Sequence, residues 1–476
     1  MKRLIILCGS AAQLLIRCIV LFLCSNVSAN AQTAIQRPNI IFIMADDLGY
    51  GDVGFNGQDK IKTPNIDRLA AEGMVFSRHY AGTAVCGPSR AALLTGIHTA
   101  HANVRELSAW TASGNPIGLQ AEEVTVAEEL KRAGYRTAVI GKWGLEEGTG
   151  EGHPLDQGFD YFYGYLTHME AHHYYPPYIW ENREKVELPQ NRTAEKIGEY
   201  SNDAFTRKAL DYVIANRETP FFLYLPYTVP HNEITVPEDA KMPYLNLGWP
   251  KRPMKQGHYY HDPEGNVTYA GMVSRLDTYV GQLMDRLREQ GLEENTLIIF
   301  TSDNGPGYDD GFFNSNGGFR GKKLTLYEGG LRMPFAAKWP AVIKPGRSTS
   351  EPVAFWDFLP TVCDIVGLRP SVHVDGVSYF PLLEGAATLP APHPTFYWEV
   401  NETRGPIQAV LMGEWKGIKQ YQKPFELYNI KQDPNETQNL AASHPDIVKQ
   451  IETYLSETRT EHPEFPLTKR EAHYDK

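Results

Sequence analysis

Cys86 is the side chain of this sequence best suited to covalent chemistry. It opens the run Cys-Gly-Pro-Ser-Arg-Ala-Ala-Leu-Leu-Thr-Gly, residues 86–96. The chain has five cysteines, of which three fall in an N-terminal leader and Cys363 falls in a distant helix-like stretch. Because Cys86 has no evident disulfide partner, the pattern indicates a reactive centre. A buried structural cysteine beside a helix start is the alternative.

Four oxygen-bearing side chains follow two strand-like runs. Asp46 and Asp47 come directly after the apolar run 39–45, and Asp303 and Asn304 come after a second such run. Because functional groups of open α/β sheets gather at the carboxyl ends of strands, we expect the two pairs to meet. Oxygen ligands suit a hard divalent cation, and a carboxylate-rich shell suits calcium better than zinc. Each pair by itself could also be a turn.

Arg90 and His231 are candidate partners for an anionic substrate. If a helix starts at Pro88, where proline is well tolerated, Arg90 returns toward the face of Cys86 within one turn. The N-terminus of that helix adds partial positive charge and free N–H groups. His231 follows the apolar run 220–225, and its chemistry suits general acid catalysis near neutral pH. The alternative for His231 is a histidine satisfied locally at a strand end.

A stretch rich in tyrosine and histidine, residues 161–177, is a candidate for substrate contacts. Its aromatic rings could stack on sugar faces, and an aromatic core loop is an equal alternative. Further pocket candidates follow the expected Cys86 helix, where a solvated or structural face is the alternative. The residues proposed to contact substrate are His98, His101, Arg105, His168, His172 and His173.

These side chains must be positioned by an α/β fold. Strand-like runs alternate with helical patterns, which predicts a mainly parallel sheet covered by helices on both faces. The strand-like runs are 39–45, 135–140, 220–225 and 296–302, and the helical patterns are 63–74, 125–133, 203–216 and 269–290.

From about residue 370 the pattern changes to short strand candidates separated by turns and followed by a helix. We therefore divide the chain into a signal peptide at 1–31, an N-terminal catalytic domain at 35–370 and a C-terminal subdomain at 371–476. The strand candidates are 381–383, 395–400, 409–413, 415–419 and 425–429, and the helix is 446–459.

The N-terminus is typical of a secretory leader. Lys2 and Arg3 precede apolar runs, and Ala29-Asn30-Ala31 matches an A-x-A cleavage pattern. The apolar stretch is too short and too broken to span a membrane, so we expect no transmembrane segment. We expect a periplasmic or secreted protein, with a lipid anchor at Cys24 as the weaker alternative. The net charge of −11 disfavours a nucleic-acid partner.

The run from Cys86 to Gly96 resembles the signature of the type I sulfatases, which include bacterial polysaccharide sulfatases and arylsulfatases. The resemblance implies an alkaline-phosphatase-like sheet sandwiched by helices and closed by a smaller antiparallel sheet plus helix. It implies that a formylglycine-generating or anaerobic sulfatase-maturating enzyme oxidises Cys86 to formylglycine (3-oxoalanine), whose hydrate is the nucleophile. It also implies one calcium ion, completed by oxygens of modified Cys86 and of the sulfate. The protein ligands implied are Asp46, Asp47, Asp303 and Asn304.

Two lysines enter through the same resemblance. Lys142, in Gly-Lys-Trp, and Lys323, shortly before Tyr-Glu-Gly-Gly, align with sulfate-binding lysines. Arg90 would support formylglycine, and His231 would lie near the leaving-group oxygen. Gly144 departs from the family pattern, which usually has a histidine there, so the resemblance does not fix the substrate.

The function expected is removal of sulfate from a sulfated polysaccharide or oligosaccharide, galactan- or ulvan-like. Two alternatives remain open at this point. One is a phosphonate or phosphate monoester hydrolase of the same fold, and the other is a catalytically silent glycan-binding protein.

Overall fold

The computed structural model describes residues 37–107, 111–252, 259–391, 393, 395–401 and 405–468. The predicted signal peptide, residues 1–31, lies outside them, as does Cys24. The chain divides into Met1–Pro38 and a compact unit, Asn39–Lys476, which holds the elements described below. Within the described ranges, no helix has the length and apolar character needed to cross a bilayer.

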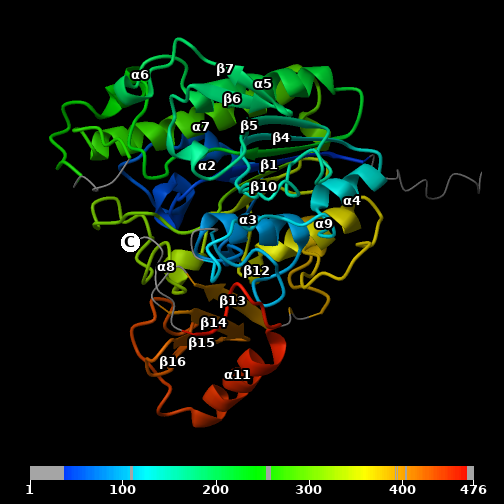
Figure 1. Ribbon diagram of the computed structural model, residues 1–476, viewed down its shortest axis with the longest axis vertical. Coiled ribbons are helices and arrows are strands. Elements are labelled where there is room, and N and C mark those ends of the chain that lie inside the picture. Colours follow the sequence, from blue (N-terminus) through cyan, green and yellow to red (C-terminus); the bar gives the residue numbers. More distant parts are fainter. Residues whose placement is uncertain are drawn as a thin grey trace, which may run out of the picture. The chain divides into compact units, whose positions relative to one another are not determined.

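A large mixed sheet occupies the centre of the compact unit (Figure 1). Its middle strands β9, β1, β8, β4 and β5 run parallel to one another, and antiparallel strands flank them on both sides. Across the sheet the described strands are β11 (Arg347–Thr349), β2 (Met74–Phe76), β10 (Ala336–Lys338), β9 (Thr296–Ser302), β1 (Asn39–Ala45), β8 (Phe221–Pro226), β4 (Arg136–Lys142), β5 (Tyr161–Tyr165), β6 (Tyr178–Glu181) and β7 (Glu184–Glu187).

Strand β1 explains why the sheet is buried on both faces. Every residue of Asn39–Ala45 is buried, as expected for an interior parallel strand with a continuous apolar sequence. Side chains alternate between faces: Ile41 and Ile43 enter one core, and Phe42 and Met44 enter the other. The four predicted strands and the mainly parallel sheet are therefore confirmed.

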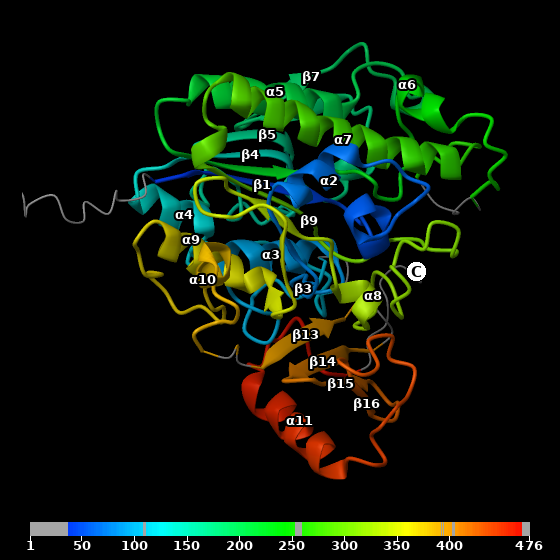
Figure 2. The same ribbon diagram turned by 180° about the vertical axis from the view of Figure 1, so that it is seen from behind.

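Helices cover both faces of the sheet (Figure 2). One layer contains α2 (Pro64–Ala71), α5 (Ser201–Ala215) and α7 (Asn266–Glu289), whose apolar side chains join the core of Ile41. The other contains α3 (Cys86–Thr95), α4 (Val126–Arg132), α9 (Phe358–Ile365) and α10 (Phe380–Glu384), which join the core of Phe42.

A small antiparallel sheet and one helix follow in the chain, as predicted. Apolar side chains of the sheet pack against Ile451 and Leu455 of the helix. The elements are β13 (Phe396–Val400), β14 (Ile407–Met412), β15 (Trp415–Gln420), β16 (Glu426–Asn429) and α11 (Pro445–Thr458). The domain boundary near residue 370 stays a prediction.

The strand expected at 381–383 is wrong, because Pro381-Leu382-Leu383 lies in helix α10. Three residues are too few to distinguish helical from strand periodicity. Pro381 fits the first turn of a helix because its fixed φ suits that position. Leu382 and Leu383 are then buried against α9 and the sheet.

Buried charges join the small sheet to α8 (Glu328–Leu331), which follows shortly after Lys323. Lys416 on β15 places its Nζ 2.9 Å from Glu328 Oε1 and 3.0 Å from Glu436 Oε1, with all three side chains fully buried. Glu328 also pairs with Arg332 and accepts a hydrogen bond from the Tyr80 hydroxyl. Burial, together with the charge of Glu328, raises the pKa of Glu436 even though Lys416 opposes the shift. This cluster therefore fixes the segment that carries Lys323.

Replacing Lys416 tests this junction. Lys416→Met should lower the free energy of unfolding at pH 7 by about 3–5 kcal/mol, because two buried carboxyl groups lose their shared cation. Adding Glu436→Gln should recover part of the loss. Urea unfolding followed by circular dichroism measures both.

Lys419→Met, on the same strand but half exposed beside Glu452, is the matched control and should change stability by at most about 0.5 kcal/mol. Equal losses of stability in the two lysine variants would contradict the role of Lys416 as the shared cation of the buried carboxyl groups.

Candidate active site

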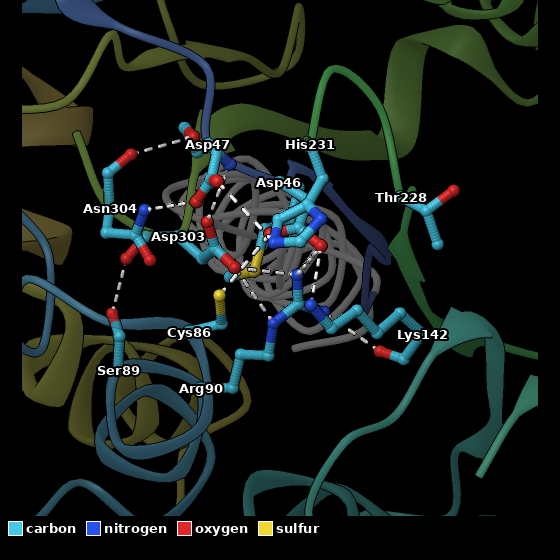
Figure 3. Close-up of polar contacts among 12 residues, drawn as sticks. Asp46, Asp47, Cys86, Ser89, Arg90, Lys142, Thr228, His231, Asp303 and Asn304 are labelled. Carbon is cyan, nitrogen blue, oxygen red and sulfur yellow. Dashed lines mark hydrogen bonds and ion pairs between the residues drawn. The ribbon is translucent and has the colours of Figure 1, made fainter. Parts of the chain in front are cut away.

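Four segments bring ionisable side chains to one edge of the large sheet (Figure 3). Asp46 follows β1, Asp303 follows β9, Lys142 ends β4, and His231 lies in the loop after β8. These four strands are neighbours and parallel, so their carboxyl ends meet. The strand order thus explains why residues far apart in the sequence converge.

Each buried carboxylate faces a cation. Lys142 Nζ lies 2.6 Å from Asp46 Oδ2, and Lys323 Nζ lies 2.7 Å from Asp47 Oδ1. Burial alone would raise the pKa of Asp46, but Lys142, His231, Arg90 and Lys323 together hold it well below its usual range. The pKa values of Lys142 and Lys323 are raised, because Asp46 and Asp47 outweigh the effect of burial. Asp46, Lys142 and Lys323 are therefore charged at neutral pH.

Arg90 joins the helix of Cys86 to the sheet. Its Nε and Nη2 donate to Asp303 Oδ2 over 3.0 and 2.7 Å, and its Nη1 donates to the carbonyl of Lys142 over 2.9 Å. The helix begins at Cys86 rather than at Pro88, so Arg90 lies one turn from Cys86. The predicted convergence of the two side chains is seen, although the predicted helix start lay two residues too late.

Ser89 was not assigned a role from the sequence. Its Oγ donates to the carbonyl of Asp303 over 2.5 Å and accepts from the Gly82 N–H over 3.0 Å. Because both partners are backbone groups, Ser89 fixes the start of α3 against the end of β9. Its place between Cys86 and Arg90 was the only signal in the sequence.

Cys86 is the first residue of α3, and its side chain points into the cluster. Its Sγ lies 3.5 Å from Asp46 Oδ1 and 3.2 Å from Lys323 Nζ. Burial raises the pKa of the thiol despite the opposing effect of Lys142 and Lys323. The thiol is therefore protonated at neutral pH, and only a thiolate is a good nucleophile. Unmodified Cys86 is poorly suited to attack a substrate.

The predicted metal ligands were tested against their contacts. Asp47 adopts a left-handed backbone (φ 64°), its N–H donates to Asp303 Oδ1 over 3.1 Å, and Asn304 Nδ2 donates to Asp47 Oδ1 over 2.7 Å. Among the described residues, Asp47 Oδ2 and Asn304 Oδ1 are buried without a hydrogen-bond partner. Oxygens of this kind suit a hard cation.

The charge of the cluster supports the same interpretation. One ligand atom each from Asp46, Asp47, Cys86 and His231 lies within 4.8 Å of the others. Burial and the neighbouring charges of Asp46 and Asp47 raise the pKa of Asp303 to about 6, although Arg90 lowers it. The carboxylates thus repel one another, and a bound cation would relieve that repulsion. These residues fit a calcium ion. Asp303 Oδ2 also accepts hydrogen bonds from Arg90.

His231 lies between Asp47 and the tyrosine- and histidine-rich stretch at 161–177. Its Nε2 is 3.6 Å from Asp47 Oδ2, and its ring stacks on His172 with centroids 5.3 Å apart. His172 Nε2 is 3.0 Å from the hydroxyl of Tyr259, a residue that sequence reasoning missed, although it lies among further tyrosines and histidines at 258–261.

His168 and His173 take different positions. A Cβ placed on Gly144 would lie 3.9 Å from His168 Cβ and 3.7 Å from Lys142 Cε, so His168 lies near the position left by the missing family histidine. Its Nδ1 is 2.8 Å from Glu147 Oε1. His173 is partly exposed, and its Nδ1 is 3.3 Å from Glu233.

The other three pocket candidates lie away from Cys86. His98, His101 and Arg105 follow the C-terminal end of α3, whose ten residues separate its ends by about 15 Å. His101 contacts Asp375, and Arg105 donates to the carbonyls of Ala102 and Thr460. We therefore withdraw their assignment to the substrate pocket, since their polar groups hold distant segments together.

Comparison with known proteins identifies the chain. Residues 38–368 match the family described as Sulfatase, and residues 317–461 match N-sulphoglucosamine sulphohydrolase, C-terminal. The chain belongs to the sulfatase family. It is thus a sulfuric ester hydrolase, and the predicted family and enzyme class are confirmed.

Two curated relatives are similar over nearly the whole chain. N-acetylgalactosamine-6-sulfatase of Mus musculus is 30% identical, covering 97% of this sulfatase and 84% of the relative. N-acetylgalactosamine-6-O-sulfatase of Bacteroides thetaiotaomicron is 30% identical, covering 89% of this sulfatase and 94% of the relative.

Solved structures agree with the fold. Ps i-CgsB has a TM-score of 0.75 and 30% identity, covering 90% of this sulfatase and 95% of that chain, and it was also solved with k-i-k-neocarrahexaose. The phosphonate monoester hydrolase of Agrobacterium radiobacter has a TM-score of 0.63 and 21% identity, covering 89% of this sulfatase and 95% of that chain. It shares only the fold. The alkaline-phosphatase-like fold expected from the sequence is confirmed.

Proposed function

We propose that this sulfatase removes sulfate from a sulfated polysaccharide or oligosaccharide, using Cys86 converted to formylglycine. The position of Cys86 carries the proposal: it opens α3 beside Asp46 and Lys323, yet its thiol is held protonated. Conversion to an aldehyde would place two hydroxyl groups of its hydrate where the thiol now lies. The names of the relatives, an N-acetylgalactosamine-6-sulfatase and a protein solved with a neocarrahexaose, support a carbohydrate substrate.

The chemistry follows from those two hydroxyl groups. One hydroxyl would attack sulfur and give up its proton while the bond from sulfur to the sugar oxygen breaks and that oxygen takes up a proton, so the sugar would leave as an alcohol and sulfate would stay on residue 86. The second hydroxyl would then lose its proton as the carbon–oxygen bond to sulfate breaks, which would release sulfate and restore the aldehyde. A serine ester would lack this second hydroxyl.

The surrounding groups would act on charge and protons. Lys142 and Lys323 lie where they would offset charge on the sulfuryl oxygens, assisted by the N-terminus of α3. A calcium ion held by Asp46, Asp47, Asp303 and Asn304, with an oxygen of modified Cys86, would add positive charge to the same oxygens. His231 would protonate the leaving sugar oxygen. His168 and His172 would contact the sugar, with His173 at the rim.

Export and maturation complete the proposal. The leader at 1–31 would direct the chain to the periplasm or outside the cell, and a maturation enzyme would convert Cys86. The catalytic domain at 35–370 would carry most of the site, with the subdomain at 371–476 supporting the segment of Lys323.

The role of Cys86 is tested by coexpression with a formylglycine-generating enzyme. We expect the tryptic peptide spanning Cys86 to carry formylglycine, and the protein to release sulfate from sulfated oligosaccharides. Cys86→Ala should abolish release while calcium still binds. The matched control is Cys363→Ala, which removes the second buried free thiol of the described residues and should keep activity. An unmodified, fully active wild type, or an active Cys86→Ala variant, would refute the mechanism.

The metal site is tested by calcium binding to chelator-treated protein. Within the predicted ligand set, Asp47 Oδ2 and Asn304 Oδ1 are buried and have no hydrogen-bond partner among the described residues. Asp47→Asn and Asn304→Leu should therefore each weaken binding about tenfold or more. Titration calorimetry measures the affinity. Asp59→Asn, at a strongly exposed carboxylate, should bind calcium as wild type does, and equal binding by all four proteins would rule out this site.

The acid role of His231 is tested by changing the leaving group. His231→Gln should slow release from a sugar sulfate by about 10²–10⁴-fold, because an alkoxide leaves poorly without a proton. Release from 4-nitrophenyl sulfate should fall much less, since that phenolate is a stable leaving group. His444→Gln, at the start of α11 and outside the site, is the control and should leave both rates unchanged. A uniform loss on both substrates after His231→Gln would argue against proton donation.

A further inference from the structure

A second group of metal-ligating side chains lies at the other end of α3 from Cys86. His98 and His101 follow the end of this helix, and Asp375 comes from a segment far along the chain. One ligand atom of each of these three residues lies within 4.8 Å of the others. His373 joins them, with its Nε2 3.3 Å from Asp375 Oδ1.

The spacing around Asp375 is close to that of a tetrahedral zinc site. His101 Nδ1 is 2.8 Å from Asp375 Oδ1, and His98 Nδ1 is 3.6 Å from Asp375 Oδ2. Zinc bonds of about 2.0–2.2 Å in tetrahedral geometry place ligand atoms about 3.3–3.5 Å apart. Small movements of the rings would therefore bring one nitrogen of His98, one nitrogen of His101 and a carboxylate oxygen of Asp375 to a common centre. His373, which lies close to Asp375, would turn its exposed side chain to become the fourth ligand.

The hydrogen bonds of His101 point to a cation between its ring and Asp375. Its Nε2 lies 2.9 Å from the carbonyl oxygen of Thr458, which only accepts, so Nε2 carries a hydrogen. Its Nδ1 faces a carboxylate oxygen. A neutral ring with its proton on Nε2 would direct a lone pair at that oxygen, so either a proton or a metal ion must lie between them. A histidine that donates its distal N–H to a backbone carbonyl is the usual second shell of a zinc ligand.

The other two histidines fit the same interpretation. The Ala100 N–H donates to His98 Nδ1 over 3.3 Å, so this nitrogen carries a lone pair and no hydrogen. The same Nδ1 lies 3.6 Å from Asp375 Oδ2, so a rotation of the ring would turn its lone pair from the Ala100 N–H toward an ion held by Asp375. The His373 side chain is 79% exposed, which leaves a path for an ion. Imidazole nitrogen with carboxylate favours zinc over the hard cation of the catalytic site.

We propose that His98, His101, Asp375 and His373 form a structural zinc site. It would link three segments: the turn after α3, the segment at 373–375, and the end of α11 through Thr458. Two backbone contacts already bring these segments together, since Asp375 N donates to the carbonyl of Gly96 and Thr460 N donates to the carbonyl of Ala100. Zinc would stabilise the end of α3 opposite Cys86 without contact with the substrate.

The test uses full-length protein in a Cys86→Ala, His231→Gln background with excess calcium, so that the catalytic cluster does not compete for zinc. After treatment with a chelator, zinc is titrated against a chromophoric competitor and bound metal is counted by mass spectrometry. We expect one zinc per chain and a higher unfolding temperature with zinc. Co²⁺ in its place should show the intense d–d absorption of a tetrahedral ion.

His98→Gln and His101→Gln should each weaken zinc binding about tenfold or more. Because either variant could fold poorly, His373→Ala, at the exposed ligand, should also weaken binding while circular dichroism stays unchanged. His444→Ala, at the start of α11, is the matched control and should bind zinc as the background protein does. No bound zinc in the background protein, or equal affinity in the His373, His98 and His101 variants, would overturn the site and leave His101 as an imidazolium paired with Asp375.

Discussion

Three carboxylates lie buried at the carboxyl ends of β1 and β9, and the segments around them are arranged by the need to offset their charge. A buried carboxylate without a partner is costly, so each attracts a cation from another part of the chain. Lys142 comes from β4, Arg90 from α3, and Lys323 from the segment before α8. The ion pairs that offset the buried charge therefore also assemble the site.

This constraint also governs Cys86. Placing a thiol among buried charges does not activate it, because desolvation outweighs the two nearby lysines. The same lysines would stabilise oxygen-borne charge on a sulfate, where anionic oxygens approach them directly. The environment is thus better suited to an oxidised side chain and an anionic substrate than to a cysteine nucleophile.

Helix α3 connects the site to the rest of the molecule at both of its ends. Its N-terminus is fixed by Ser89 and Arg90 to the end of β9. Its C-terminal end contacts Asp375 through the Gly96 carbonyl, close to His98 and His101. The small sheet supports the site by another route, since Lys416 on β15 holds Glu328, five residues after Lys323. The C-terminal elements thus hold in place the segments that carry the candidate site residues.

Much of the fold and of the site could be predicted from the sequence, because the information is local. Continuous apolar runs determined the parallel strands, and acidic or basic residues directly after them determined which strand ends carry chemistry. The Cys-Gly-Pro-Ser-Arg run likewise predicted a reactive residue with an arginine beside it, and both side chains lie at the strand ends. Local patterns failed where a segment was too short to show a period, as at Pro381-Leu382-Leu383, which forms a helix.

Only the tertiary structure decided which histidines approach the site. His98 and His172 are equally plausible from sequence, yet one lies beyond the far end of α3 beside Asp375 and the other stacks on His231. The roles of Ser89, Tyr259 and Lys416 were also hidden, because their partners are backbone groups or side chains distant in sequence. Residue type and spacing determine what chemistry a side chain can perform, whereas the packing of distant segments determines what it meets and whether its charge is offset.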